Sequence, residues 1–412
     1  KVDSREERNE RAMYGEAVFQ AVSNAGALSF ASVFLVRLGA PAWLLGFYTS
    51  IPALMTILFS LPMGSIVQRK RNLVATINRM RFIFRTGVGS MALLSYLPSW
   101  ISPYVLVATR GLIAIPDTAL QVAQTTLIGE ITTPRRRTRM ISTRAAIMGL
   151  FSAAVGFLAG QWLDSARFPS NYQLLFFTAF LSGIGSVWAI SKIRPLGGAP
   201  PPKSKPRASM NLRRMLALIG RTPPFRSFVI ASFLFRIGMS LPMGLYSLYR
   251  VRVLGSSDSW IGILYTVQRL LNVGSYFALS RLVTRERVRR WLWVGCLFMA
   301  FYPLTTALAK TPQALLIPSV ILGVFSPSMS LFLMDTLFLV SPEDQRPTFV
   351  AANSFVSSLT RFAVPILGTL LASMTSIPLI LIVGAGLRFV GGFAFWFMGV
   401  TSQKRLRGLI PS

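Results

Sequence analysis

The sequence alternates between long apolar stretches and short polar interruptions. Most of the apolar stretches are about 20 residues or longer, the helical length that crosses the ~30 Å hydrocarbon layer of a bilayer. Charged residues, Pro, Gly and Ser bound the stretches, as is usual at the ends of membrane helices. The pattern predicts twelve spanning helices, at 13–37, 42–66, 73–97, 101–128, 138–163, 171–191, 225–250, 259–281, 290–309, 313–339, 348–373 and 378–400.

The composition agrees with this pattern and limits the kinds of chemistry that the protein can perform. Of the 412 residues, 52% are hydrophobic and only 14% are charged, whereas soluble proteins carry about 25% charged residues. The sequence has no histidine and a single cysteine, Cys296, which argues against histidine-based catalysis, histidine-ligated metals and internal disulfides. We expect an all-α integral membrane protein that is not an enzyme and needs no cofactor or metal.

The formal net charge of +30 is explained by where the basic residues lie. They cluster at the ends of apolar stretches, without the polar basic surface of a nucleic-acid module, so no nucleic-acid partner is expected. The basic clusters fall in alternate loops, at 69–71, 135–139, 192–226, 285–290 and 404–407. The opposite loops, such as 97–103 and 374–378, are nearly free of charge. Because short loops rich in Lys and Arg stay in the cytoplasm, we expect both termini there, and a bacterial inner membrane as the location.

A segment rich in Pro, Gly and basic residues, 193–224, separates the spans into two sets of six. It predicts an N-terminal six-helix bundle at 1–192, a cytoplasmic linker, and a C-terminal six-helix bundle at 225–412. The halves also share a repeat. WLLGFYT at 43–49 opens the second span and WIGILYT at 260–266 opens the eighth, an offset of 217 residues (260 − 43). Parallel repeats of this kind are typical of transporters with a central site between the halves.

The loop between the second and third spans reads GSIVQRKRN, at 64–72. It resembles the signature loop of the major facilitator superfamily, in which Gly is followed after three residues by Asp and then by basic residues. Gly64 and Arg69 match this signature. Gln68 stands where the family has Asp, which weakens the charge-based latch expected at this turn.

The ends of the fourth and tenth spans extend the resemblance to both halves. They read GEITTPRRR at 129–137 and SPEDQR at 341–346. The resemblance implies that Arg137 and Arg346 act in gating together with the matching residues of the first loop. It also implies twelve helices in two pseudo-symmetric bundles and secondary transport by alternating access, by a monomer.

Charged side chains inside a membrane are costly and mark functional sites by default. The acidic candidates for proton coupling are Asp117 in the fourth span, then Asp335 in the tenth, and Glu16 near the start of the first. Asp117 lies seven residues after Arg110, on the same helix face and about 10 Å along the axis, so the two are expected to share a cavity without pairing directly. For two of these acids an interpretation without proton coupling stays open. Asp117 follows Pro116 and caps or kinks its helix, and Glu16 is solvated or pairs at a gate.

Arginines inside the spans outnumber the acids, so some must contact water, backbone carbonyls or an anion. They are Arg85, Arg110, Arg144, Arg236, Arg269, Arg361 and Arg388. Snorkelling toward the headgroups fits Arg85 and Arg144. The residues assigned to a substrate cavity are Gln20, Asn24, Arg110, Arg236, Arg269 and Arg361. Gln20 and Asn24 are four residues apart and therefore share a helix face. A cavity rich in Arg favours carboxylate, phosphate or sulfonate groups, which fit its planar fork.

Three functions remain open. The first is proton-coupled export of an amphipathic or drug-like small molecule by antiport, favoured by the sparse acids and by a partial glycine-rich antiporter motif at Gly149, Gly156 and Gly160. The second is uptake or flipping of an anionic solute or lipid, favoured by the surplus arginines. The third is a non-transporting assembly or sensor protein on the same fold. The expected partners are a small-molecule substrate, a proton or other coupling ion, and membrane lipids.

Overall fold

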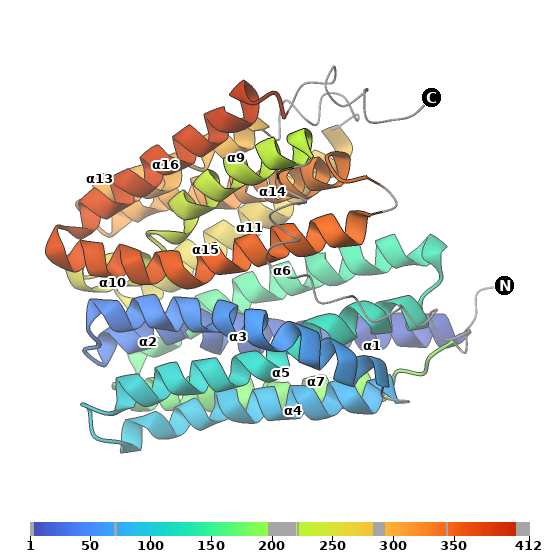
Figure 1. Cartoon of the computed structure of the whole chain (residues 1–412). Coiled ribbons are helices and arrows are strands. Elements are labelled where there is room, and N and C mark those ends of the chain that lie inside the picture. Colours follow the sequence, from blue (N-terminus) through green and yellow to red (C-terminus); the bar gives the residue numbers. More distant parts are fainter. Residues whose placement is uncertain are drawn as a thin grey trace. The chain divides into compact units, whose positions relative to one another are not determined.

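The computed structural model describes residues 4–69, 72–196, 220, 222–282, 293–342 and 345–400. Within these ranges the chain is built of helices joined by turns, without a strand. Figure 1 shows the helices as long rods, most of them connected by short turns. The all-α class predicted from the sequence is confirmed.

The first six predicted spans are all present. They are formed by α1 (Ser4–Ala21) with η1 (Val22–Leu28) and α2 (Ser29–Arg37), by α3 (Ala42–Arg69), by α4 (Leu73–Ser90) with η2 (Met91–Tyr96), and by α5 (Ser102–Ile131), α6 (Pro134–Ser165) and α7 (Ser170–Ser191). The first span begins nine residues earlier than predicted (13 − 4), because α1 continues through a charged segment. Glu6 and Glu7 lie in its first turn, where acidic side chains stabilise the amino end of a helix dipole.

The second half supplies the other six. They are formed by α9 (Pro223–Ser240) with α10 (Leu245–Leu248) and η3 (Tyr249–Val253), by α11 (Asp258–Leu282), by 293–308 including α13 (Phe301–Leu308), by η4 (Gln313–Leu315) with α14 (Leu316–Leu339), and by α15 (Arg346–Met374) and α16 (Ile377–Phe397). The ends of these helices that fall within the described residues lie within four residues of the predicted ones. The twelve-helix arrangement is confirmed over the described ranges.

The helix of the first span is interrupted at its middle. Residues 22–28 form the π-helical segment η1, and such segments are frequent at functional sites. In the seventh span, α9 ends at Ser240 and a turn at 241–244 precedes α10. The repeat offset places Asn24 opposite residue 241 (24 + 217), so both halves leave regular α-helix at equivalent positions.

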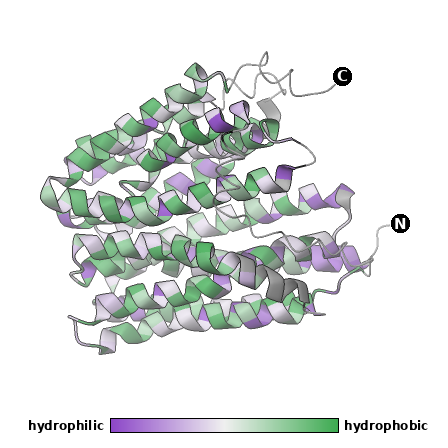
Figure 2. Ribbon diagram, viewed as in Figure 1, coloured by the Kyte–Doolittle hydropathy of each residue, from purple (hydrophilic) through white to green (hydrophobic). Residues whose placement is uncertain are grey.

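The helix surfaces suit a lipid environment. Nine of the helices in the described ranges are long and apolar enough to cross a membrane. The other three spans are α4, which carries several arginines, 293–308, which is too short, and α11. Large apolar side chains such as Leu112 and Phe397 are well exposed, as expected where lipid replaces water. Figure 2 shows mostly hydrophobic ribbons, with hydrophilic residues gathered at the amino ends of α1 and α6.

Contacts divide the chain into two compact units. Unit 1 holds Lys1–Ala199 and Ser247–Leu270, and unit 2 holds Pro200–Tyr246 and Leu271–Ser412. In unit 1, α5 packs against α3 and α4, while α7 packs against α1 and α4. In unit 2, α16 packs against α9 and α13. The domain boundaries expected at the 193–224 linker stay a prediction, since most of that segment lies outside the described residues.

Candidate substrate site

A buried ion pair joins three helices of unit 1. Glu16 of α1 has a fully buried side chain, and its Oε1 accepts a hydrogen bond from Nη1 of Arg81 on α4. Its Oε2 accepts from Arg144 of α6, at 2.8 Å from Nη2 and 3.1 Å from Nε. The same Arg144 Nη2 lies 2.5 Å from Oε1 of Gln20, and Arg81 Nη1 donates to Ser186 Oγ at 2.6 Å. Both oxygens of the carboxylate are therefore engaged by guanidinium groups.

Three expectations for charged residues of unit 1 are wrong. Glu16 is not solvated, and Arg144 does not snorkel, because its guanidinium is held against Glu16. Arg85 does not snorkel either: it is only 2% exposed and donates to the hydroxyl of Ser23 on η1. The polar side chains of the first span provide partners inside the unit, so these arginines do not need to reach the membrane surface.

A cavity of about 200 Å³ lies beside this ion pair. Its lining residues come from the first, third and fourth spans and are Gln20, Asn24, Leu28, Arg81, Phe84, Arg85, Arg110, Asp117, Leu120, Gln121 and Gln124. Four residues singled out in the sequence, Gln20, Asn24, Arg110 and Asp117, thus line one cavity. Three arginines and one aspartate line it, so its charged residues sum to two positive charges (3 − 1).

Asp117 is the lone carboxylate of the cavity lining. Its Oδ2 accepts a hydrogen bond from Nε2 of Gln121 at 3.3 Å. Asp117 and Arg110 share the cavity without forming an ion pair, as their spacing of seven predicts. Asp117 lies in the middle of α5 (Ser102–Ile131), so the alternative that it caps a helix end is wrong.

In unit 2, two of the predicted arginines meet at Ser357 of α15. Arg236 of α9 is half-buried and its Nη1 donates to Ser357 Oγ at 2.7 Å. Arg361 donates from Nε to the Ser357 carbonyl at 3.3 Å. The Nε of Arg236 is buried without a hydrogen-bond partner among the described residues. Two guanidinium groups thus lie around one serine of this unit.

The remaining candidates are spread over both units. The guanidinium carbon of Arg269, in unit 1, lies 4.8 Å from the ring centroid of Tyr265. Asp335 is exposed on α14 in unit 2. Arg388 is buried and bonds the carbonyls of Gly238 and Met299, at 3.0 and 2.9 Å. Arg388 is thus an arginine inside a span whose guanidinium binds backbone carbonyls, as expected for some of the arginines that outnumber the acids.

The residues expected to act in gating are only partly described. Arg137 Nη2 donates to the carbonyls of Gly129 and Thr132, at 3.3 and 3.4 Å, and so binds the carboxyl end of α5. The guanidinium carbon of Arg346 lies 5.7 Å from the Phe338 ring centroid. Gly64, Gln68 and Arg69 belong to α3, but their side chains fall outside the described residues. Their gating role stays a prediction.

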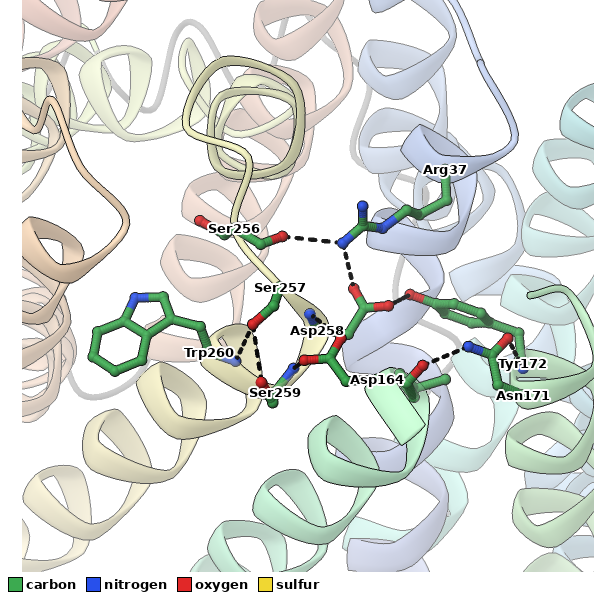
Figure 3. A network of polar contacts seen from close by, with 10 residues as sticks. Arg37, Asp164, Asn171, Tyr172, Ser256, Ser257, Asp258, Ser259 and Trp260 are labelled. Carbon is green, nitrogen blue, oxygen red and sulfur yellow. Dashed lines mark hydrogen bonds and ion pairs between the residues drawn. The ribbon is translucent and has the colours of Figure 1, made fainter. Parts of the chain in front are cut away.

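A second polar network in unit 1 surrounds Asp258, the first residue of α11 (Figure 3). Asp258 Oδ1 lies 3.1 Å from Arg37 Nη2, and its Oδ2 accepts a hydrogen bond from the Tyr172 hydroxyl at 3.0 Å. The carboxylate of Asp164, at the end of α6, accepts from the backbone N–H groups of Asp258 and Ser259, both at 2.9 Å. The start of α11 is thereby held by α2, α6 and α7, in the loops that carry few basic residues.

Arg81 of the ion pair and the roles of Arg37 and Asp258 were not predicted from the sequence. Arg81 lies one helical turn before Arg85, so the face shared by residues four apart pointed to it. The face of Gln20 and Asn24 extends back to Glu16 in the same way. The sequence signal for Asp258 and Arg37 was weaker: they are charged residues next to loops that otherwise hold almost no charge.

Comparisons with known proteins agree on the type of fold. The family model described as Major Facilitator Superfamily matches residues 17–365. A bacterial homologue of the human lysosomal transporter Spinster, inward-facing and occupied, superposes with a TM-score of 0.71 at 14% identity, over 98% of this chain and 99% of that one. The xylose transporter XylE from E. coli gives 0.67 at 13% identity, over 93% and 94%. The human organic anion transporter MFSD10 gives 0.62 at 12%, over 95% and 100%. No curated protein sequence matches the chain.

Proposed function

Because this chain belongs to the major facilitator superfamily, we propose that it is a secondary transporter of a small organic anion, and that the cavity of unit 1 forms part of the substrate site. The family and its fold support transport of small molecules by alternating access across a membrane. The class of substrate is our inference from the charges of the cavity.

The observation that carries this proposal is the excess of arginine in the cavity lining. Arg85 and Arg110 have no ion-pair partner among the described acids, and Glu16 is already bound by Arg81 and Arg144. Guanidinium groups bind carboxylate, sulfonate and phosphate through paired hydrogen bonds. In a cavity shielded from water such groups gain more from an anion than they do at a surface. The arginine pair around Ser357 offers the same chemistry in unit 2.

Asp117 supplies a site for coupling to protons. When Asp117 is ionised it neutralises part of the positive charge of Arg85 and Arg110. When it is protonated the cavity gains one positive charge, which favours binding of an anion. For an anionic substrate, proton and substrate therefore bind cooperatively and move in the same direction. For a cationic substrate they compete, which gives exchange in opposite directions.

A screen of ligand classes against the purified protein tests the proposal. Benzoate, naphthalene sulfonate and phenyl phosphate are the anionic probes, and benzyltrimethylammonium is the cationic one. A ligand at 100 times its dissociation constant stabilises the folded state by about 2.7 kcal/mol, which raises the melting temperature measurably. We expect stabilisation by at least one anion, lost in Arg110→Gln and retained in Arg167→Gln, which alters an exposed arginine outside the cavity. Stabilisation by the cation alone contradicts the proposal.

Proton-coupled export of an amphipathic compound is the second candidate. The observation in its favour is the apolar part of the cavity lining, Leu28, Phe84 and Leu120, next to the single carboxylate of Asp117. A cation seated on this apolar surface would compete with a proton for Asp117. Stabilisation by the cation that is lost in Asp117→Asn, with no effect of Arg110→Gln, selects this candidate.

We also propose that the Asp258 network closes the access route at the end opposite the basic loops. The network ties the start of α11, from the second half of the sequence, to three helices of the first half. If the halves rock against each other as in other transporters with this repeat, these bonds must break when that end opens.

The variant Asp258→Asn tests this closure. It removes the ion pair with Arg37 but keeps the size of the side chain, so the open state becomes more populated. With Cys296 replaced by Ser and Asn24 by Cys, we expect a membrane-impermeant thiol reagent, added from the side opposite the basic loops, to label residue 24 several-fold faster. The control Arg167→Gln alters an exposed arginine in the turn between α6 and α7, at the same end of the spans, and should leave the labelling rate unchanged. Equal labelling rates in Asp258→Asn and the parent contradict the closure.

A further inference from the structure

A groove of about 550 Å³ opens on unit 1 where α1 begins and α7 ends. It shares no lining residue with the cavity described above. Four basic side chains line it: Arg8 and Arg11 of α1, and Lys192 and Arg194 directly after α7. None of the four forms an ion pair with an acid in the described ranges. The groove therefore has four positive charges that form no ion pair with a carboxylate of the described chain.

The two segments that supply these charges are fastened to each other. The buried Asn9 side chain donates from Nδ2 to the Arg194 carbonyl at 2.7 Å, and its Oδ1 accepts from the Arg194 backbone N–H at 2.9 Å. The ammonium of Lys192 lies 3.3 Å from the ring centroid of Trp188. The segments that carry the cations are thus joined by two hydrogen bonds between the Asn9 side chain and the Arg194 backbone, and Lys192 also contacts an aromatic ring.

The rest of the groove is apolar and roomy. Phe19 and Trp188 belong to its lining, and no atom lies within 4 Å of the position that a side chain at Gly15 would take. The groove lies at the end of the spans that carries the basic loops, and Trp188 and Lys192 are residue types that anchor helices at the membrane interface. A ligand with a phosphate at one end and hydrocarbon at the other matches both parts.

We propose that this groove binds an anionic phospholipid, with its phosphate among Arg8, Arg11, Lys192 and Arg194 and its acyl chain along Gly15 and Phe19. Basic pockets between membrane helices on the cytoplasmic side recognise such headgroups. A free phosphate ion could use the basic residues, but it would leave the apolar part of the groove uncovered. The bound lipid bridges the amino end of α1 and the carboxyl end of α7, and so stabilises the packing of the first span against the sixth.

The test compares short-chain phosphatidylglycerol with short-chain phosphatidylcholine and with inorganic phosphate, each added to the purified full-length protein in a neutral detergent. Thermal unfolding and native mass spectrometry report binding. We expect phosphatidylglycerol to raise the melting temperature by several degrees and to be retained as a one-to-one adduct. The triple variant Arg8→Gln, Arg11→Gln, Lys192→Gln should weaken this binding at least tenfold. The matched triple Arg79→Gln, Arg135→Gln, Arg139→Gln, exposed and outside the groove, should bind as the parent does.

A second variant keeps the test informative if the charge variant does not fold. Gly15→Phe fills the empty part of the groove and leaves every charge in place, and we expect it to lose the phosphatidylglycerol adduct. Equal retention of phosphatidylglycerol by Gly15→Phe and the parent overturns the proposal, as does equal retention by the charge variant. Equal stabilisation by inorganic phosphate shows an anion site without lipid recognition and also overturns it. If phosphatidylcholine binds as tightly as phosphatidylglycerol, the groove does not select anionic headgroups, and the proposal is overturned.

Discussion

Glu16→Gln is expected to lower the free energy of unfolding by about 3–5 kcal/mol, the cost of breaking a buried ion pair by removing one partner. The substitution leaves the buried Arg81 and the partly buried Arg144 without a counter-charge, since Glu16 is the only acid that pairs with either of them in the described chain. Reversible unfolding of the purified protein in detergent micelles measures the change. Because the three side chains join α1, α4 and α6, we expect transport activity to fall together with stability.

Two comparisons make this prediction specific. Glu10→Gln removes a carboxylate on the same helix, whose Oε2 lies 3.2 Å from Arg136 Nη2 in a partly exposed pair, and pairs of this type contribute about 0–1 kcal/mol. The double variant Glu16→Gln, Arg144→Gln also removes one of the two guanidinium groups left without a partner. Its destabilisation should therefore be smaller than the sum of the destabilisations of the two single variants. If Glu16→Gln is no more destabilising than Glu10→Gln, the buried ion pair does not hold the three helices together.

Asp117→Asn is expected to abolish coupling to protons while leaving the fold intact. The substitution fixes a neutral side chain at the only acidic position of the cavity lining. We therefore expect accumulation driven by a pH gradient in proteoliposomes to fall at least tenfold, whereas exchange of labelled for unlabelled substrate continues without a gradient. Neutral Asn also leaves Arg110 without a nearby negative charge, so affinity for an anion should be kept or increased.

The control for this prediction is Glu130→Gln, which alters an acid on the same helix that does not line the cavity. It should retain gradient-driven accumulation. Asp335→Asn tests the second acid proposed from the sequence, which lies in unit 2. If Asp335→Asn loses gradient-driven accumulation and Asp117→Asn keeps it, the coupling site lies in unit 2 and our assignment is wrong.

The twelve helices could be predicted from the sequence because span length and apolar content are local properties of the chain. The cavity could be predicted in part for the same reason. Gln20 and Asn24 share a helix face, and so do Arg110 and Asp117, which the 3.6-residue period determines without knowledge of neighbouring helices. All four line the same cavity.

The pairing of Glu16 with Arg81 and Arg144 could not be predicted in this way. It depends on how α1, α4 and α6 are rotated and placed against one another, which local periodicity does not determine. The position of Arg85 and Arg144 along their spans favours snorkelling, but position along one span says nothing of the partners that neighbouring helices provide. Inside the bundle, polar groups such as Ser23 and Glu16 provide closer partners. The Asp258 network has the same character, since its contact with Arg37 joins residues 221 positions apart.

Selectivity for anions is tested by counterflow transport in proteoliposomes loaded either with one unlabelled organic anion or with an unlabelled quaternary amine. Labelled aryl carboxylate, sulfonate and phosphate, and a labelled quaternary amine, are added outside in separate experiments. We expect that an anion is taken up, that Arg110→Gln lowers its uptake at least tenfold, and that Arg167→Gln does not. Counterflow of the amine in amine-loaded vesicles, unaffected by Arg110→Gln and without uptake of any anion, would contradict this expectation.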